Sequence, residues 1–141
     1  MPGMNITGRV VTGSQQGAKF TGLDWVKRQF VQKLGIDPFP GTLNIILETP
    51  GDVQKWNNLR TAPHIEIIPP NDEWCTAYCF PVRILDLYPA AIVYPDVPDY
   101  PGNQIEIVAA LPLRTSMSLV DGDTLTLQVN KSQNINRGHF R

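Results

Sequence analysis

The sequence predicts a mainly β protein, a small barrel that carries one main helix. Short runs of branched apolar residues recur along its 141 residues, and 13 prolines and 11 glycines interrupt them often. Only one segment places apolar side chains at helical spacing over several turns. A chain of this length can bury a single hydrophobic core, so the barrel is expected to form one domain over residues 1–130.

The first strand is expected at residues 4–12, where Ile6, Val10 and Val11 are the apolar members. A polar loop bounded by glycines follows at residues 13–20 and contains Lys19. Its backbone amides and the lysine could hold phosphate, although the spacing is not that of a Walker A loop. On the residues alone, a plain hairpin connection is the simpler interpretation.

The main helix is predicted at about residues 22–34, because apolar residues recur there on one helix face. These residues are Leu23, Val26, Phe30 and Leu34. Thr21 followed three residues later by Asp24 resembles a capping box, and Gly35 is the expected stop. The stripe is expected to pack against the core.

Residues 38–47 place two prolines and a glycine directly before a strand signal at residues 43–47. Alternation along a strand puts Thr42 and Asn44 on the same face. One hydroxyl and one amide oxygen beside a turn suit Mg²⁺, which keeps several waters and shares phosphate oxygens. The alternative is a structural turn, in which both side chains bond to local backbone, and the residues alone favour that alternative.

The second half of the chain alternates strands with turns. Strands are expected at residues 65–68, 74–87, 90–94, 105–108 and 124–129, with an interruption at Pro81 and a short helix at 52–56. A proline-rich loop at residues 95–103 precedes Glu106, which alternation places opposite Ile105 and Ile107. Such a carboxylate is either part of an exposed polar face or a substrate acceptor, and the residues alone favour the polar face.

Composition argues against several classes of function. The net charge of -1 gives no strong field for nucleic acid or a membrane surface. The sequence has neither a transmembrane run nor a signal-peptide pattern, so a cytoplasmic protein is expected. Cys75 and Cys79 are expected to be buried free thiols, because the chain has few other zinc ligands. Residues 131–141 are expected to form a flexible tail.

The order of these motifs resembles the archaeal CTP-dependent riboflavin kinases. The resemblance covers about residues 6–130, and its most specific string is Pro-Phe-Pro-Gly-Thr-Leu-Asn at 38–44. Further matching strings lie at residues 8–13, 91–95, 105–109, 113–114 and 121–123. The resemblance implies a six-stranded cradle-loop barrel. It also implies transfer of the γ-phosphoryl of CTP to the terminal ribityl hydroxyl of riboflavin, which gives FMN and CDP and uses Mg²⁺.

By position, the resemblance makes Thr42 and Asn44 the magnesium ligands and places Glu106 against the flavin. We hypothesise that Glu106 orients or deprotonates the attacking hydroxyl, because it is the only carboxylate carried over. The nucleotide would be held by Ser14, Gln15, Gln16, Gly17, Ala18 and Lys19, with Leu111, Pro112, Leu113 and Arg114 lining its base.

The sequence also departs from the family pattern. Gln15 stands where a further glycine is usual, and Lys19 stands where an aromatic residue is common. Before Glu106 the family carries an Arg/Lys-Thr-x-His string whose threonine contacts the flavin, whereas residues 97–100 read Val-Pro-Asp-Tyr here. Pro98 would therefore take the flavin-contacting position with neither a hydroxyl nor an N–H to donate.

These departures leave alternatives open. The magnesium half of the implied site is intact and the flavin half is altered. A CTP-dependent kinase of another small alcohol therefore also fits, as does a non-catalytic barrel that binds nucleotide, flavin or a partner protein. A monomer is expected. No winged-helix segment precedes the barrel, so no DNA-binding role is expected.

Overall fold

The computed structural model describes residues 4–13 and 16–129, and the tail expected at 131–141 lies outside them. Its strands are β1 (Met4–Val11), β2 (Leu43–Ile46), β3 (Ile65–Ile67), β4 (Ala77–Ile84), β5 (Tyr88–Pro95), β6 (Gln104–Ala109) and β7 (Thr124–Val129). Its helices are α1 (Gln16–Thr21), α2 (Asp24–Leu34), α3 (Pro50–Arg60) and α4 (Leu113–Ser116).

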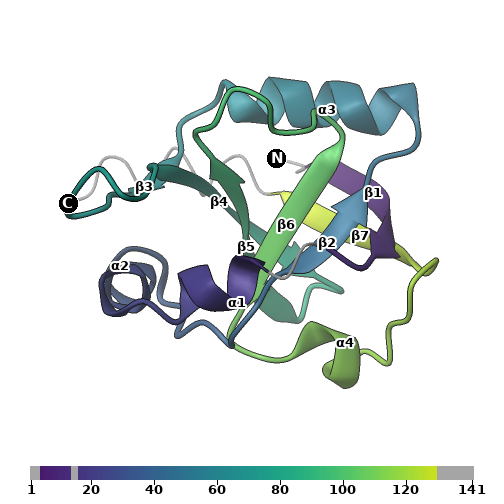
Figure 1. Ribbon diagram of the computed structural model, residues 1–141. Coiled ribbons are helices and arrows are strands. Elements are labelled where there is room, and N and C mark those ends of the chain that lie inside the picture. The colour runs from purple at the N-terminus through teal and green to yellow at the C-terminus, as the bar shows by residue number, and fades with distance from the viewer. Residues whose placement is uncertain (1–3, 14–15, 130–141) are drawn as a thin grey trace.

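Six of the strands form a closed antiparallel barrel in the order β4-β5-β6-β2-β1-β7, as Figure 1 shows. The barrel closes where β7 returns to β4 and Gln128 pairs with Arg83. The short strand β3 adds to β4 outside the ring, through the pairs Ile65–Cys79 and Ile67–Ala77. This topology confirms the predicted barrel.

The barrel interior is filled by apolar side chains, and helices cover its two ends. The interior cluster includes Ile6, Val10, Ile45, Phe80, Ile84, Ile92, Ile105, Ile107, Leu125 and Leu127. Trp56 and Leu59 of α3 join this cluster, and so does Leu113 of α4. Figure 1 shows α3 across the top of the barrel and α4 below it. Burial of these helix side chains therefore holds both helices to the barrel.

A second apolar cluster lies outside the barrel, where α2 packs beside β3 and against outward-facing residues of β4, β5 and β6. Val26 and Phe30 of α2 pack with Val93 and Val108, and all four are buried. Residues on both faces of β5 and β6 are therefore buried, which explains why their sequences read as nearly continuous apolar runs. Glu106 and Gln104 are the polar residues on the outward face of β6.

The segment from residue 16 to residue 24 differs from the prediction. Gln16–Thr21 forms helix α1 instead of a loop, and the main helix α2 begins only at Asp24. The predicted capping box was wrong, because Leu23 is the N-cap of α2 and makes no side-chain capping bond. Thr21 is buried, and its hydroxyl donates to the carbonyl of Gly17 at 2.9 Å.

Two further predictions were wrong. Strand β4 runs through Pro81 without interruption, because Pro81 lies between the residues where β4 pairs with β3 and the one where it pairs with β7. Cys75 is exposed, whereas Cys79 is a buried thiol as predicted. Burial raises the pKa of the Cys79 thiol to about 12.

Helix α3 is longer than the short helix predicted at 52–56, because its N-terminus is capped and its apolar residues pack on the barrel. The Thr49 hydroxyl caps the N-terminus by accepting from the Asp52 amide at 3.0 Å, and Pro50 takes the first turn. Trp56 then lies edge-on against Phe80 at a ring distance of 5.6 Å. Its indole N–H has no hydrogen-bond partner among the described residues.

We therefore expect Trp56→Ala to lower the free energy of unfolding by about 3–5 kcal/mol, the usual cost of emptying an aromatic core position. Trp56→Phe should cost clearly less, because it keeps a ring against Phe80 and removes the unpaired N–H. Urea unfolding measures both, with the exposed Gln54→Ala in the same helix as a control that stays near wild type. Equal losses for the two Trp56 variants would contradict this account.

Candidate functional site

The candidate site is centred on the pairing of β2 with β6, which places Asn44 opposite Glu106 on the outer face of the barrel. Thr42 directly precedes β2, and its hydroxyl donates to Glu106 Oε1 at 3.0 Å. The Asn44 side-chain nitrogen lies 3.5 Å from the Thr42 hydroxyl and 3.4 Å from the Thr42 carbonyl oxygen. The structure thus brings together the two predicted metal ligands and the predicted catalytic carboxylate.

Thr42 and Asn44 are approached so closely that only glycine fits at two positions, one in helix α1 and one just after β1. A Cβ added to Gly17 would lie 2.6 Å from the Thr42 hydroxyl and 3.0 Å from its backbone nitrogen. A Cβ added to Gly13 would lie 2.5 Å from Asn44 Cγ. The Thr21 hydroxyl ties α1 to the stretch before β2, since it accepts from the Gly41 amide at 2.9 Å. Gly17, from the segment predicted to hold the nucleotide, therefore lies against Thr42, and Gly13, just before that segment, lies against Asn44.

A pocket of about 270 Å³ lies next to Thr42. It is lined by residues 39–43, by Ile107 and Ala109, and by residues 111–115. Leu111, Pro112, Leu113 and Arg114, predicted to line the nucleotide base, therefore share this pocket with Thr42. The pocket is about the right size for part of a nucleotide.

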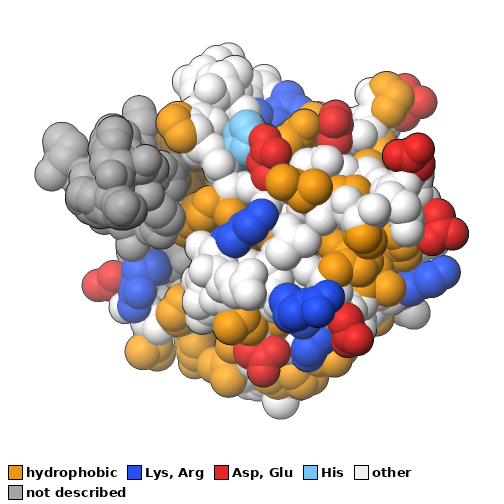
Figure 2. All heavy atoms as spheres, turned by 90° about the vertical axis from the view of Figure 1, so that its left-hand side faces the viewer, with side chains coloured by type: hydrophobic (Ala, Val, Ile, Leu, Met, Phe, Trp, Pro, Cys, Tyr) orange, Lys and Arg blue, Asp and Glu red, His pale blue; other side chains and the backbone are white. Residues whose placement is uncertain are grey.

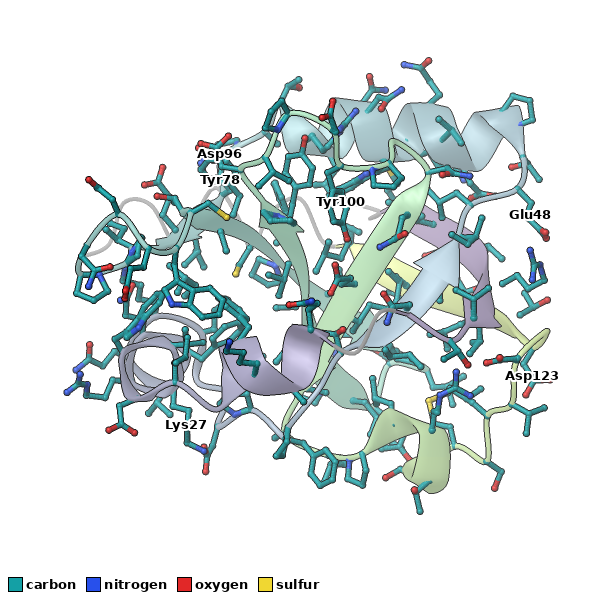
Figure 3. The ribbon with its side chains drawn as sticks, viewed as in Figure 1. Lys27, Glu48, Tyr78, Asp96, Tyr100 and Asp123 are labelled. Atoms are coloured by element: carbon teal, nitrogen blue, oxygen red, sulfur yellow. The ribbon has the colours of Figure 1, made fainter. Side chains whose placement is uncertain are left out.

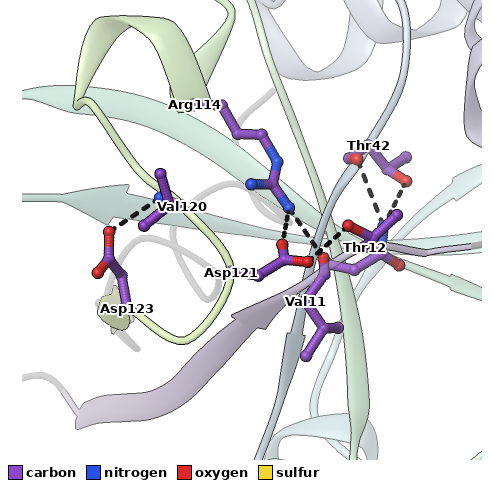
Figure 4. A network of polar contacts seen from close by, with 8 residues as sticks. Val11, Thr12, Thr42, Arg114, Val120, Asp121 and Asp123 are labelled. Carbon is purple, nitrogen blue, oxygen red and sulfur yellow. Dashed lines mark hydrogen bonds and ion pairs between the residues drawn. The ribbon is translucent and has the colours of Figure 1, made fainter.

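Arg114 is fixed at the edge of this pocket by a polar network, shown in Figure 4. Its guanidinium donates to the Val11 carbonyl at 3.2 Å and to Asp121 Oδ1 at 2.6 Å. The Thr12 hydroxyl donates to the second oxygen of Asp121 at 2.7 Å. The hydrogen bond from Arg114, with that from Thr12, holds the pKa of the Asp121 carboxyl below its ordinary value. Arg114 thus anchors the lining segment to β1.

The other residues predicted to bind the nucleotide are not all found beside the pocket or Thr42. Gln16, Ala18 and Lys19 lie on the exposed side of α1, and the Lys19 ammonium stands 6.0 Å from the ring of Trp74. Ser14 and Gln15 lie outside the described residues. Their predicted roles stay predictions.

On the far side of Glu106 stands Tyr100, a residue that the sequence reasoning missed. Its hydroxyl donates to Glu106 Oε2 at 2.5 Å and accepts from the Gln104 side chain at 3.3 Å. Burial and the neighbouring Glu106 carboxylate raise the pKa of Tyr100, so its hydroxyl stays a donor. Pro98, predicted to contact the flavin, is exposed in the same loop. The aromatic residue two positions after Pro98 was the signal that could have drawn attention to this contact.

The donor set fits a magnesium ion that shares phosphate oxygens. The Thr42 hydroxyl donates a hydrogen bond to Glu106, so the lone pairs of its oxygen remain available to a metal ion. An amide can be turned by 180° with little change in shape, and this would place Asn44 Oδ1 about where Nδ2 lies, near the Thr42 hydroxyl. Among the residues the structure describes, no three His, Cys, Asp or Glu side chains gather as a metal cluster. Two neutral oxygens beside one carboxylate therefore suit Mg²⁺ rather than a transition metal.

Charges of both signs occur on the face of the molecule in Figure 2. On the face in Figure 2, hydrophobic side chains are interspersed with groups of both charges rather than with one continuous basic area. The chain as a whole carries a net charge of -1. Within the described part of the chain, no helix has the length and apolar character needed to cross a membrane.

The fold and site define a class: a closed β-barrel domain with a hydroxyl, an amide and a carboxylate gathered beside a ligand-sized pocket. Comparison with known proteins specifies the family. The model of the CTP-dependent riboflavin kinase family, described as "Domain of unknown function DUF120", matches residues 10–129. The chain belongs to this family.

Curated relatives agree with that membership, and each is named riboflavin kinase. The relative from Methanocella arvoryzae is 40% identical over 121 residues, which make up 82% of this chain and 52% of the relative. The relative from Methanosarcina mazei is 36% identical over 91% of this chain and 57% of its own length. The one from Saccharolobus solfataricus is 33% identical, over 89% of this chain and 74% of its own length. The chain thus spans a little over half the length of the first two relatives.

The contact of α1 with Thr42 predicts opposite effects for two helical glycines. Gly17→Ala should lower the free energy of unfolding by about 1–3 kcal/mol through overpacking, although alanine is the better helix former. Gly51→Ala in α3 should be neutral or stabilising, because its Cβ would meet only Thr49 Oγ1, at 3.9 Å. Urea unfolding of the two variants tests the contact. A stabilising Gly17→Ala would mean that α1 does not press on Thr42.

Proposed function

We propose that this domain transfers the γ-phosphoryl group of CTP to the terminal ribityl hydroxyl of riboflavin, with Mg²⁺, and releases FMN and CDP. The observation that carries the proposal is the position of Glu106. Its carboxylate accepts from the same threonine that borders the pocket, so it stands where a nucleotide in that pocket would meet an acceptor. Family membership supports the reaction class.

The donor nucleotide would lie between α1 and the segment before α4. Its base would contact residues 111–114 in the pocket, and its phosphates would extend toward Thr42. Residues 14–19 would contribute backbone amides and the Lys19 charge to the phosphates. Fixing the phosphates in this way supplies positioning, which accounts for much of the catalysis in phosphoryl transfer.

Thr42 and Asn44 would hold the magnesium ion, which neutralises phosphate charge when it is bound. Both side chains are held by the barrel, since Asn44 lies within β2 and is 7% exposed, and Thr42 directly precedes that strand. The close packing of Gly13 and Gly17 restricts the movement of both side chains. The ligand pair is therefore preorganised by the barrel.

Glu106 would act on the acceptor. The hydroxyl oxygen forms a bond to the γ-phosphorus, the bond from that phosphorus to the CDP oxygen breaks, and the hydroxyl proton passes to the Glu106 carboxylate. The leaving CDP keeps the electron pair of the broken bond. Because phosphoryl transfer needs little covalent assistance, orientation of the hydroxyl by Glu106 contributes alongside proton acceptance.

One observation favours a second candidate, a kinase of another small alcohol. The loop before β6 places the exposed Pro98 where the family pattern has a flavin-contacting threonine, and Tyr100 from this loop already contacts Glu106. The acceptor side of the site thus differs from the family pattern, while on the donor side residues 111–114 share the pocket with Thr42. That the protein is a monomer stays a prediction.

The first test is a product assay. Purified protein with riboflavin, Mg²⁺ and CTP should form FMN, separated by chromatography, whereas ATP should be a poor donor and EDTA should abolish product. A rise in melting temperature with CTP and Mg²⁺ but without FMN would indicate a different acceptor, since a ligand that binds only the folded state must stabilise it. If no FMN forms and the melting temperature does not rise, the non-catalytic barrel is favoured.

Glu106→Gln tests the role of the carboxylate. We expect the turnover number to fall at least about 100-fold, the usual contribution of a general base, while CTP and Mg²⁺ still raise the melting temperature. Glu66→Gln is the matched control, because Glu66 is also a strand carboxylate with a side-chain partner, His64, at 3.2 Å. An unchanged turnover number in Glu106→Gln would remove the proposed catalytic role.

A further inference from the structure

Each of the two oxygens of Glu106 accepts a hydrogen bond, one from each flank of β6. The Thr42 hydroxyl, just before β2, donates to Oε1 at 3.0 Å, and the Tyr100 hydroxyl, in the β5–β6 loop, donates to Oε2 at 2.5 Å. Strands β2 and β5 are the two neighbours of β6. The carboxylate is therefore clamped between two hydroxyl groups rather than free to rotate.

Tyr100 is itself held in place by its surroundings. The Gln104 side chain donates to its oxygen at 3.3 Å, so the hydroxyl proton remains directed at Glu106. Its ring lies edge-on to Tyr94 at 5.7 Å, and the Tyr94 hydroxyl accepts from Arg60 of α3 at 3.1 Å. Figure 3 shows Tyr100 above β6, on the side of the barrel that α3 covers. This support gives the phenol one position at little cost in entropy.

We propose that Tyr100 is a positioning residue for the transfer, whose phenol holds the Glu106 carboxylate against Thr42 in one orientation toward the acceptor hydroxyl. This inference rests on the proposed function. Each carboxylate oxygen can accept two hydrogen bonds, so Oε2 keeps room for the acceptor while Tyr100 stays bound. An acceptor hydroxyl then meets an oriented partner, and this orientation favours the reactive geometry.

Tyr100→Phe removes the hydroxyl and keeps the ring against Tyr94. We expect its turnover number with CTP and riboflavin to fall about tenfold or more, the loss typical of one hydrogen bond to a charged group. The KM for CTP should stay within about twofold, because Tyr100 does not line the nucleotide pocket. A residue that merely stabilised the fold would not lower the turnover number selectively at a temperature where the variant is folded.

Tyr78→Phe is the matched control. The Tyr78 hydroxyl also donates to a carboxylate, Asp96 Oδ2 at 3.0 Å, and Figure 3 shows the pair apart from Tyr100. This variant should keep the wild-type turnover number. A second readout needs no activity: urea midpoints of Tyr100→Phe, Glu106→Gln and the double variant should be non-additive, because Tyr100→Phe removes the same hydrogen bond that Glu106→Gln weakens by removing the charge of its acceptor.

The outcomes separate this inference from the proposed function. If the unmodified protein forms no FMN, the proposed function fails and the positioning role fails with it. If the unmodified protein forms FMN and Tyr100→Phe forms it equally fast, only the positioning role is overturned. A faster Tyr100→Phe would also overturn it and would mean that the phenol blocks the acceptor. Additive urea midpoints would show that the bond to Glu106 does not form in solution.

Discussion

The register between β2 and β6 is the constraint on which the site depends. The two strands are joined antiparallel so that Asn44 pairs with Glu106, although β3, β4 and β5 lie between them in sequence. A shift of either strand by one residue would turn its polar side chain, Asn44 or Glu106, toward the apolar interior and carry its isoleucine, Ile45 or Ile105, outward. Burial of those isoleucines, both nearly inaccessible, therefore fixes the position of the polar pair. The hydrophobic core and the candidate site are consequences of the same register.

The Glu106 carboxylate lies on an outer face of the barrel where most side chains are apolar and covered. Helix α2 buries Val93 and Val108, so the barrel wall next to Glu106 is dry on one side. A carboxylate in such a place needs hydrogen-bond donors, and Thr42 and Tyr100 supply them. The hydrogen bond from the Gly41 amide to the Thr21 hydroxyl holds helix α1 beside the start of β2. Thr42, Glu106 and Tyr100 thus form a polar group between the barrel interior and the apolar cluster beside α2. Fixed hydrogen bonds in such surroundings suit the stabilisation of charge that moves between two bound ligands.

Much of the fold followed from local patterns, and the failures have physical causes. The alternation at Thr124–Val129 and the helical stripe of α2 were read directly, because each buries one face. Helix α1 was missed because its glycine is unfavourable in helices, and its place is set by contact with Thr42 instead of by propensity. The predicted capping box does not form because the Thr21 hydroxyl donates to the Gly17 carbonyl and accepts from the Gly41 amide. Continuity of β4 through Pro81 depended on which strands lie beside it.

The sequence by itself determined the strand-rich barrel, the polar face shared by Thr42 and Asn44, and the family to which these motifs point. Local spacing suffices for these features because side chains two apart on a strand share a face. Only the tertiary structure decided that Glu106 meets Thr42 and that Tyr100 meets Glu106. The first contact crosses 64 positions of sequence and depends on strand pairing. The second depends on how a proline-rich loop folds back onto β6, which no periodic pattern encodes.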